Sequence, residues 1–166
     1  QALLMRSNLL AAKGKDDEAK ADLDKLRKVS PDLPQAILLN SMIAAGKKRW
    51  GEAINDMQLL LQADPTNADY RIRLAAYYVG DTRPRKAIEL LTQVLETQSD
   101  PGDKETRVEA LRARADALLS VGRHADAVKD YEAALKLDPE DTGVLNNYAW
   151  VLATSPDDGV RNADKS

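Results

Sequence analysis

Gly-Arg-His-Ala-Asp-Ala-Val-Lys-Asp-Tyr-Glu-Ala-Ala-Leu-Lys-Leu-Asp-Pro is the sequence of residues 122–139, and it has the pattern of a turn, an amphipathic helix and a stop. The glycine at its start tolerates the positive φ that ends many helices. Ala127, Tyr131 and Ala134 then recur at the spacing of one helical face. Pro139 has no amide hydrogen, so it cannot continue the helix. The stretch therefore predicts one complete helix with a turn before it and a stop after it.

The same pattern occurs three more times upstream, and its period can be counted. The alanines equivalent to Ala127 are Ala19, Ala53 and Ala87, so successive copies are 34, 34 and 40 residues apart. Two apolar residues follow each alanine at helical spacing, which gives the sets Leu23, Met57, Leu91 and Tyr131, and Leu26, Leu60, Val94 and Ala134. Prolines close the copies at Pro31, Pro65, Pro101 and Pro139, the third of them two residues late. Four helix-turn-helix copies in register are therefore expected.

A period of about 34 residues with helix-turn-helix content resembles the tetratricopeptide repeat family, and the resemblance extends over essentially all of the chain. It implies an all-α fold, a right-handed α-solenoid of antiparallel helix pairs (a tetratricopeptide superhelix) with four repeats plus one further helix. The run from Leu145 to Pro156 is similar to a bacterial variant in which the following loop leads into one more helix. The expectation is therefore a bacterial-type fragment of a longer array, cut at both ends.

The predicted domain organisation assigns residues 1–33 to repeat one, 34–67 to repeat two, 68–101 to repeat three, 102–107 to an insertion, 108–141 to repeat four and 142–166 to the first helix and loop of a truncated repeat five. After the insertion, the next helix is expected to begin near Lys104. Arg114 stands where the family usually has an apolar residue, so it is expected to be only partly buried.

The composition excludes several classes of protein. Charged residues make up 31% of the chain but nearly balance, at a formal net charge of −3, which excludes a strongly basic nucleic-acid binder. The short basic clusters at 47–49 and 83–86 lie in turns beside acidic neighbours, where a solvated surface explains them. With no cysteine there are no disulfides and no thiolate chemistry. No stretch approaches the roughly 20 apolar residues of a membrane span, and nothing in the sequence indicates a compartment.

Catalytic chemistry has few candidate residues in this sequence. The single histidine, His124, falls at the place in its turn that Trp50 takes in repeat two, which favours a packing or surface role. The acidic pairs at 16–17 and 157–158 lie at helix starts and turns, where capping explains them. No glycine-rich phosphate loop follows a strand, and no serine has a histidine at plausible spacing. We therefore predict that the chain is not an enzyme and uses no cofactor or metal.

The family resemblance implies a partner-binding groove. In that family, inward-pointing residues on the first helix of each repeat line a concave groove that holds a peptide or a helix. The main candidates at these positions are Leu4, Asn8, Leu38, Met42, Ile72, Val79, Arg112, Asp116, Asn146 and Trp150, and the other groove positions are Ala11, Ala45, Ala76, Leu119 and Ala153. Leu38, Met42 and Ile72 are expected to form an apolar floor, and Trp150 is a candidate anchor.

Some members of the family clamp the C-terminal carboxylate of chaperones with lysine and asparagine side chains. Asn8 and Arg73 match that pattern here, but Leu4 replaces the first lysine and Leu39 replaces the second asparagine. The clamp is therefore not expected.

The resulting hypothesis is a protein-interaction scaffold that binds a protein or peptide partner in its groove. Three alternatives remain open. The groove could be filled by other parts of the same chain, and the chain could be a non-catalytic docking or regulatory arm of a larger enzyme or secretion/assembly machine. It could also be a self-association module, a weak homo-oligomer through uncovered end helices.

Overall fold

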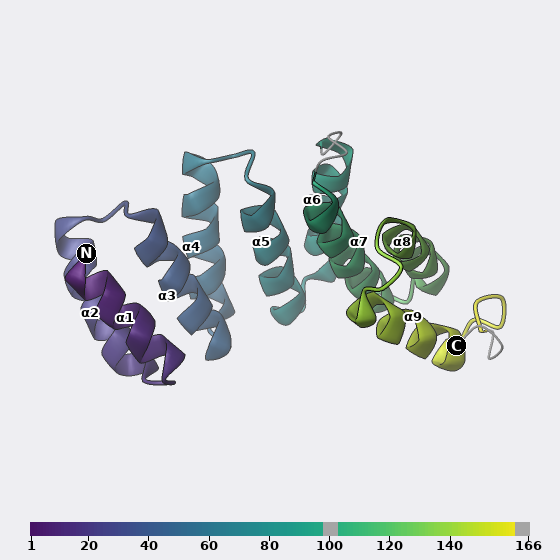
Figure 1. Cartoon of the computed structure of the whole chain (residues 1–166), viewed down its shortest axis with the longest axis horizontal. Coiled ribbons are helices and arrows are strands. Elements are labelled where there is room, and N and C mark those ends of the chain that lie inside the picture. The colour runs from purple at the N-terminus through teal and green to yellow at the C-terminus, as the bar shows by residue number, and fades with distance from the viewer. Residues whose placement is uncertain (98–102, 162–166) are drawn as a thin grey trace. The chain divides into compact units, whose positions relative to one another are not determined.

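The computed structural model describes residues 1–97 and 103–161, and these form nine helices and no strand. The helices are α1 (Ala2–Ala12), α2 (Asp16–Val29), α3 (Pro34–Gly46), α4 (Trp50–Ala63), α5 (Ala68–Gly80), α6 (Pro84–Thr97), α7 (Lys104–Leu119), α8 (His124–Leu137) and α9 (Thr142–Thr154) (Figure 1). The predicted all-α class is confirmed, and α7 begins at Lys104 as expected. The sequence also predicts a longer loop through residues 99–102, and these residues lie outside the described ones.

The chain divides into two compact units. Unit 1 comprises residues 1–70 and unit 2 comprises residues 71–166. In unit 1, α1 packs on α2, α3 packs on α4, and α2 and α1 both contact α3. Its helices pack through a core that contains Ala19, Leu23, Leu26, Ala36, Leu39 and Ile43.

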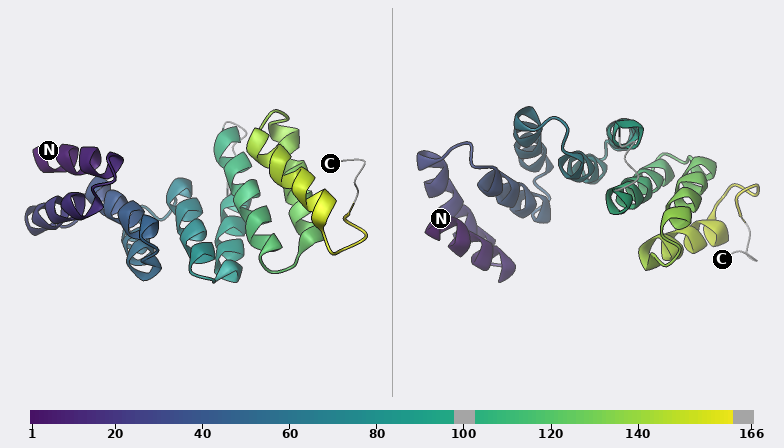
Figure 2. Two further views of the ribbon diagram at one scale, coloured as in Figure 1. Left: turned by 90° about the horizontal axis from the view of Figure 1, so that it is seen from below. Right: turned by 45° about the horizontal axis from the view of Figure 1, so that its top comes forward.

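Unit 2 is built in the same way, with α6 packed on α7, α7 on α8 and α8 on α9 (Figure 2). The core here contains Val108, Leu111, Ala115, Leu118, Ala127, Tyr131, Ala134, Val144, Val151 and Val160. Val160 lies beyond the end of α9 and is only 8% exposed. The described residues after α9 therefore pack back onto the core of unit 2 through Val160, although the sequence predicts uncovered end helices.

The recurring alanine is fully buried in every copy of the repeat. Ala19, Ala53, Ala87 and Ala127 are all 0% exposed. A side chain of one methyl group lets the two helices of a pair approach closely, and a larger one would force them apart. The complete burial of all four alanines agrees with such a packing role.

Each turn between paired helices contains one residue with positive φ at the same place in the repeat. Gly14 and Gly122 take this conformation at φ 71° and 76°, as a glycine does at little cost. Lys48 and Thr82 take it at φ 57° and 59°, although both have side chains. The glycines of those two repeats, at positions 46 and 80, instead end α3 and α5 as helical residues.

Candidate partner-binding surface

A cavity of about 390 Å³ lies in unit 1 beside α1 and α3. Its lining is mostly apolar or small and consists of Asn8, Ala11, Ala12, Asp16, Leu39, Met42, Ile43 and Gly46. Asn8, Ala11 and Met42 were predicted from the sequence as groove positions, and the structure places them around one cavity. The Met42 side chain is 47% exposed, so a partner can reach it.

The three other predicted residues of unit 1, which are Leu4, Leu38 and Ala45, do not line this cavity. Leu4 is half-buried and packs against the core of α2 and α3. Leu38 is half-buried too, and its carbonyl oxygen accepts a 2.7 Å hydrogen bond from the Ser41 hydroxyl. The cavity instead uses Leu39 and Ile43, which also belong to the core. The sequence pattern therefore identified the helices that form the cavity more accurately than the residues.

Two predicted groove residues on α5 are poorly accessible. Ile72 is only 5% exposed, so the expectation that it forms an open apolar floor with Leu38 and Met42 is wrong. Val79 is half-buried. The reason is that Ile72 lies two residues before Leu74 and three before Ala75, both of which are also buried. A wide apolar stripe on this helix buries a position that the family pattern places on the edge of the groove.

Asp116 on α7 is an exposed carboxylate with a fixed orientation. Its Oδ1 accepts a hydrogen bond from the hydroxyl of buried Tyr131, and a second, at 3.1 Å, from the side-chain amide of Asn147. Burial raises the pKa of Tyr131, and the neighbouring Asp116 carboxylate raises it further, so the phenol keeps the proton that it donates. Asn147 was not predicted, although it lies beside the predicted Asn146.

Three further predicted groove residues of unit 2 differ in how accessible their side chains are to a partner. Arg112 lies against the start of α9, where its Nη1 is 3.9 Å from the carboxylate of Asp141, and a Cβ at position 143 would come within 2.9 Å of the same nitrogen. Asn146 is exposed, and Trp150 is 59% exposed. Trp150 thus remains a candidate anchor, whereas Arg112 is already engaged.

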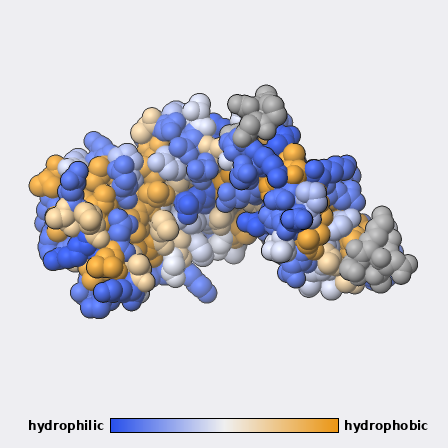
Figure 3. Space-filling model, viewed as in Figure 1, coloured by the Kyte–Doolittle hydropathy of each residue, from blue (hydrophilic) through white to orange (hydrophobic). Residues whose placement is uncertain are grey.

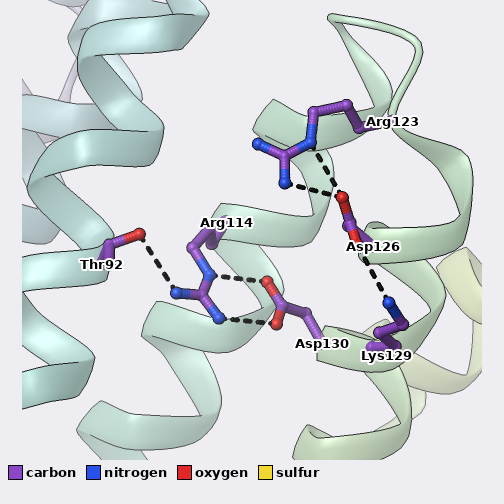
Figure 4. Close-up of polar contacts among 6 residues, drawn as sticks. All are labelled: Thr92, Arg114, Arg123, Asp126, Lys129 and Asp130. Carbon is purple, nitrogen blue, oxygen red and sulfur yellow. Dashed lines mark hydrogen bonds and ion pairs between the residues drawn. The ribbon is translucent and has the colours of Figure 1, made fainter.

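Sequence reasoning missed a set of polar pairs that join the two helices of a repeat. The Arg114 guanidinium donates two hydrogen bonds to Asp130, at 2.7 and 2.8 Å, and a third, at 3.1 Å, to Thr92 on α6 (Figure 4). Arg114 is 22% exposed at its side chain, which confirms the expected partial burial. The hydrogen bonds to Asp130 raise the pKa of Arg114.

Two pairs in unit 1 occupy equivalent positions, 16 residues apart. Arg6 donates two hydrogen bonds to Asp22, and Asn40 donates one to Asp56 at 2.5 Å. Asp56 also accepts a 2.5 Å hydrogen bond from Arg27 on α2. The available signal was an aspartate three residues after the recurring alanine in three of the four copies.

Large apolar side chains are exposed mainly on unit 1, and orange surface over that part of the chain is visible in Figure 3. The most exposed among the described residues are Met5, Leu9, Val29, Met42 and Leu59 in unit 1, and Leu145 and Trp150 in unit 2. Unit 1 thus offers more apolar contact surface than unit 2.

The described part of the chain contains no cluster of three His, Asp or Glu side chains suited to a metal ion. Within that same part, no helix combines the length and the apolar character that crossing a membrane requires. His124 is the first residue of α8 and is half-buried, as Trp50 is in α4, and its buried Nδ1 has no hydrogen-bond partner.

Comparisons with known proteins agree with this architecture. The sequence model of the tetratricopeptide repeat family matches residues 108–141. A curated relative, DnaJ homolog subfamily C member 3 of Rattus norvegicus, is 28% identical over 112 residues, which cover 62% of this chain and 21% of that protein. The chain therefore spans about a fifth of the length of this relative.

Two solved structures show the same fold. PilF of Pseudomonas aeruginosa superposes with a TM-score of 0.76 and 18% identity, over 91% of this chain and 66% of that one. The first tetratricopeptide domain of Spaghetti, solved with an HSP90 peptide of sequence SRMEEVD, gives a TM-score of 0.61 and 19% identity, over 71% of this chain and 89% of that one. Residues 108–141 therefore match a tetratricopeptide repeat, and the helix pairs described above have the fold of tetratricopeptide repeat proteins.

Proposed function

We propose that this chain is an interaction scaffold that binds an apolar segment of a partner protein in the cavity beside α1 and α3. The tetratricopeptide fold generally mediates protein–protein interaction, and its proteins are typically non-catalytic scaffolds. The observation that carries the proposal is the lining of the cavity, in which exposed Met42 stands among small and apolar side chains.

The chemistry of this lining favours apolar side chains in the partner. Ala11, Ala12 and Gly46 leave room, and the flexible thioether of Met42 adapts to irregular shapes. Asn8 and Asp16 at the same cavity supply hydrogen-bond groups that fix the direction of a bound backbone or polar side chain. An amphipathic helix or an extended apolar segment meets both requirements.

The Spaghetti domain supports peptide binding as the general mode, but the residues of this chain favour a different kind of peptide. Its peptide carries three acidic residues. In this chain, Leu4 is a half-buried apolar residue at the place where some relatives have a lysine for the peptide carboxylate, and Asp16 adds a negative charge to the cavity. A carboxylate-rich segment would therefore be a poor occupant of this cavity.

The test compares two matched variants in a pull-down from lysate of the source cells. Met42→Glu places a charge in the cavity. Leu59→Glu places one on α4, at a residue that is 49% exposed and does not line the cavity. We expect Leu59→Glu to retain the partners of the unmodified chain and Met42→Glu to lose them. Equal retention by both variants would contradict the proposal, provided that circular dichroism shows both to be folded.

A further inference from the structure

The turn between α5 and α6 carries cations that form no ion pair with the described residues of unit 2 outside the turn. Arg83 forms an ion pair with Asp81, but within residues 1–97 and 103–161 neither Arg85 nor Lys86 forms one. Both side chains are exposed, and the first turn of α6 contains no acidic residue. Aspartate or glutamate in the first turn of a helix would offset the positive end of the helix dipole. This turn therefore has a local excess of positive charge in a chain whose net charge is −3.

Tyr78 holds two of the cations in place. The Arg83 guanidinium carbon lies 5.2 Å from the centre of the Tyr78 ring, and the Lys86 ammonium lies 5.5 Å from it. The tyrosine is only 8% exposed, so its ring is a fixed platform. Cation–π attraction restrains the two flexible side chains, and it reduces the entropy that they would lose on binding a ligand.

A cavity of about 380 Å³ opens beside these cations. It is lined by Thr82, Arg83, Pro84, Arg85, Lys86 and Val121. The ring of Pro84, the side chain of Val121 and the alkyl stems of the basic residues form apolar walls, because long cationic side chains keep their charged ends in water. The site thus combines an apolar interior with a cationic rim, and among the described residues no carboxylate lines it.

We propose that this cavity binds an acidic peptide segment in which carboxylates flank one apolar side chain. The apolar residue would enter between Pro84 and Val121, and the carboxylates would meet Arg85 and Lys86 at the rim. Nucleic acid is a less favourable occupant, because its affinity comes from many phosphate contacts and this site offers few cations. None of the residues involved lines the cavity beside α1 and α3, so this proposal does not depend on the function proposed above.

The test is a fluorescence anisotropy titration of the chain with a labelled, end-blocked peptide of sequence Glu-Glu-Leu-Glu-Glu in a buffer of low ionic strength. We expect saturable binding that weakens about tenfold in the double variant Arg85→Glu/Lys86→Glu, since the reversed charges repel the peptide. The matched control is Lys47→Glu/Lys48→Glu, which makes the same charge change in the equivalent turn of unit 1. It should bind within about twofold of the unmodified chain.

Three further arms separate this site from general attraction between charges. A peptide with glutamine in place of glutamate should not bind, a peptide with serine in place of leucine should bind several-fold more weakly, and Val121→Ser should reduce affinity for the leucine peptide. Should the charge-reversal variant fail to fold, Arg85→Gln/Lys86→Gln replaces it. The proposal would be overturned if Arg85→Glu/Lys86→Glu and Lys47→Glu/Lys48→Glu bound the leucine peptide with equal affinity. It would also be overturned if the unmodified chain bound a single-stranded DNA oligonucleotide of the same charge as tightly as the peptide.

Discussion

Two equivalent positions of the repeat hold charged residues in α7 and α8 but apolar residues in α5 and α6. In the former, Arg114 and Asp130 form a hydrogen-bonded ion pair. In the latter, the residues 13 before and 3 after the recurring alanine are Leu74, which is buried, and Leu90, which is half-buried. The repeat therefore accepts either a hydrogen-bonded polar pair or an apolar pair at these positions. The recurring alanine, in contrast, is the same in all four copies.

Breaking the ion pair from one side should give the largest loss of stability. In Asp130→Ala, the half-buried Arg114 guanidinium keeps its desolvation cost but loses two charge-assisted hydrogen bonds. We expect the free energy of unfolding to fall by about 2–3 kcal/mol, somewhat less than for a fully buried pair. Urea denaturation followed by circular dichroism measures this loss.

The control for this variant is Asp126→Ala on the same helix. Asp126 forms ion pairs with Arg123 and Lys129, whose side chains are 56% and 73% exposed, and such pairs contribute little. A loss of about 0.5 kcal/mol or less is expected for it. Equal losses in the two variants would mean that Asp130 stabilises the repeat no more than a surface charge does.

Enlarging the invariant alanine should cost nearly as much. Ala53→Leu adds three carbon atoms at a point where the side chain is 0% exposed. Overpacking of this kind typically costs about 1–3 kcal/mol. The measurement is the urea midpoint, with Ala63→Leu at the end of α4, where the residue is exposed, as the control. An unchanged midpoint for Ala53→Leu would show that the two helices can move apart freely there.

Changing both members of the ion pair should cost far less than changing one. Arg114→Leu/Asp130→Leu reproduces the residues of α5 and α6 and removes the desolvation cost of two charges. Replacement of buried ion pairs by apolar residues is often neutral or stabilising. We expect the double variant to lie within about 1 kcal/mol of the unmodified chain, and Arg114→Leu alone to be clearly less stable because it leaves Asp130 buried without its partner. A double variant as unstable as Asp130→Ala would show that the two positions are not interchangeable.

The helices were predictable from the sequence because a 34-residue period fixes where each helix begins and ends. The pairing of Arg114 with Asp130 was not, because its two members lie 16 residues apart on different helices and only the fold brings them together. Ile72 was misjudged for a related reason, since its burial depends on how wide the apolar face of α5 is. The cavity beside α1 and α3 was predicted only in part, because half-buried Leu4 and Leu38 follow the same spacing as Asn8 and Met42.

The backbone conformation of the turns was likewise only partly predictable from the sequence. Substitutions in these turns should give the smallest change in the free energy of unfolding. A glycine marks the left-handed position at 14 and 122, but the sequence gives no such sign at Lys48 or Thr82. The left-handed region costs a residue with a Cβ roughly 1–2 kcal/mol, while glycine gains freedom in the unfolded chain that offsets about 0.4–1 kcal/mol of this. Thr82→Gly should therefore raise the free energy of unfolding by about 0.5 kcal/mol.

The reverse substitution in the other turn of unit 2 sharpens this test. A Cβ at position 122 would meet nothing within 4 Å, so Gly122→Thr changes the backbone energy without a steric clash. It should lower the free energy of unfolding by about as much as Thr82→Gly raises it, or by slightly more because threonine is β-branched. Thermal denaturation of both variants beside the unmodified chain measures the two shifts. Shifts of the same sign would mean that contacts of the Thr82 side chain, rather than backbone strain, determine the stability of its turn.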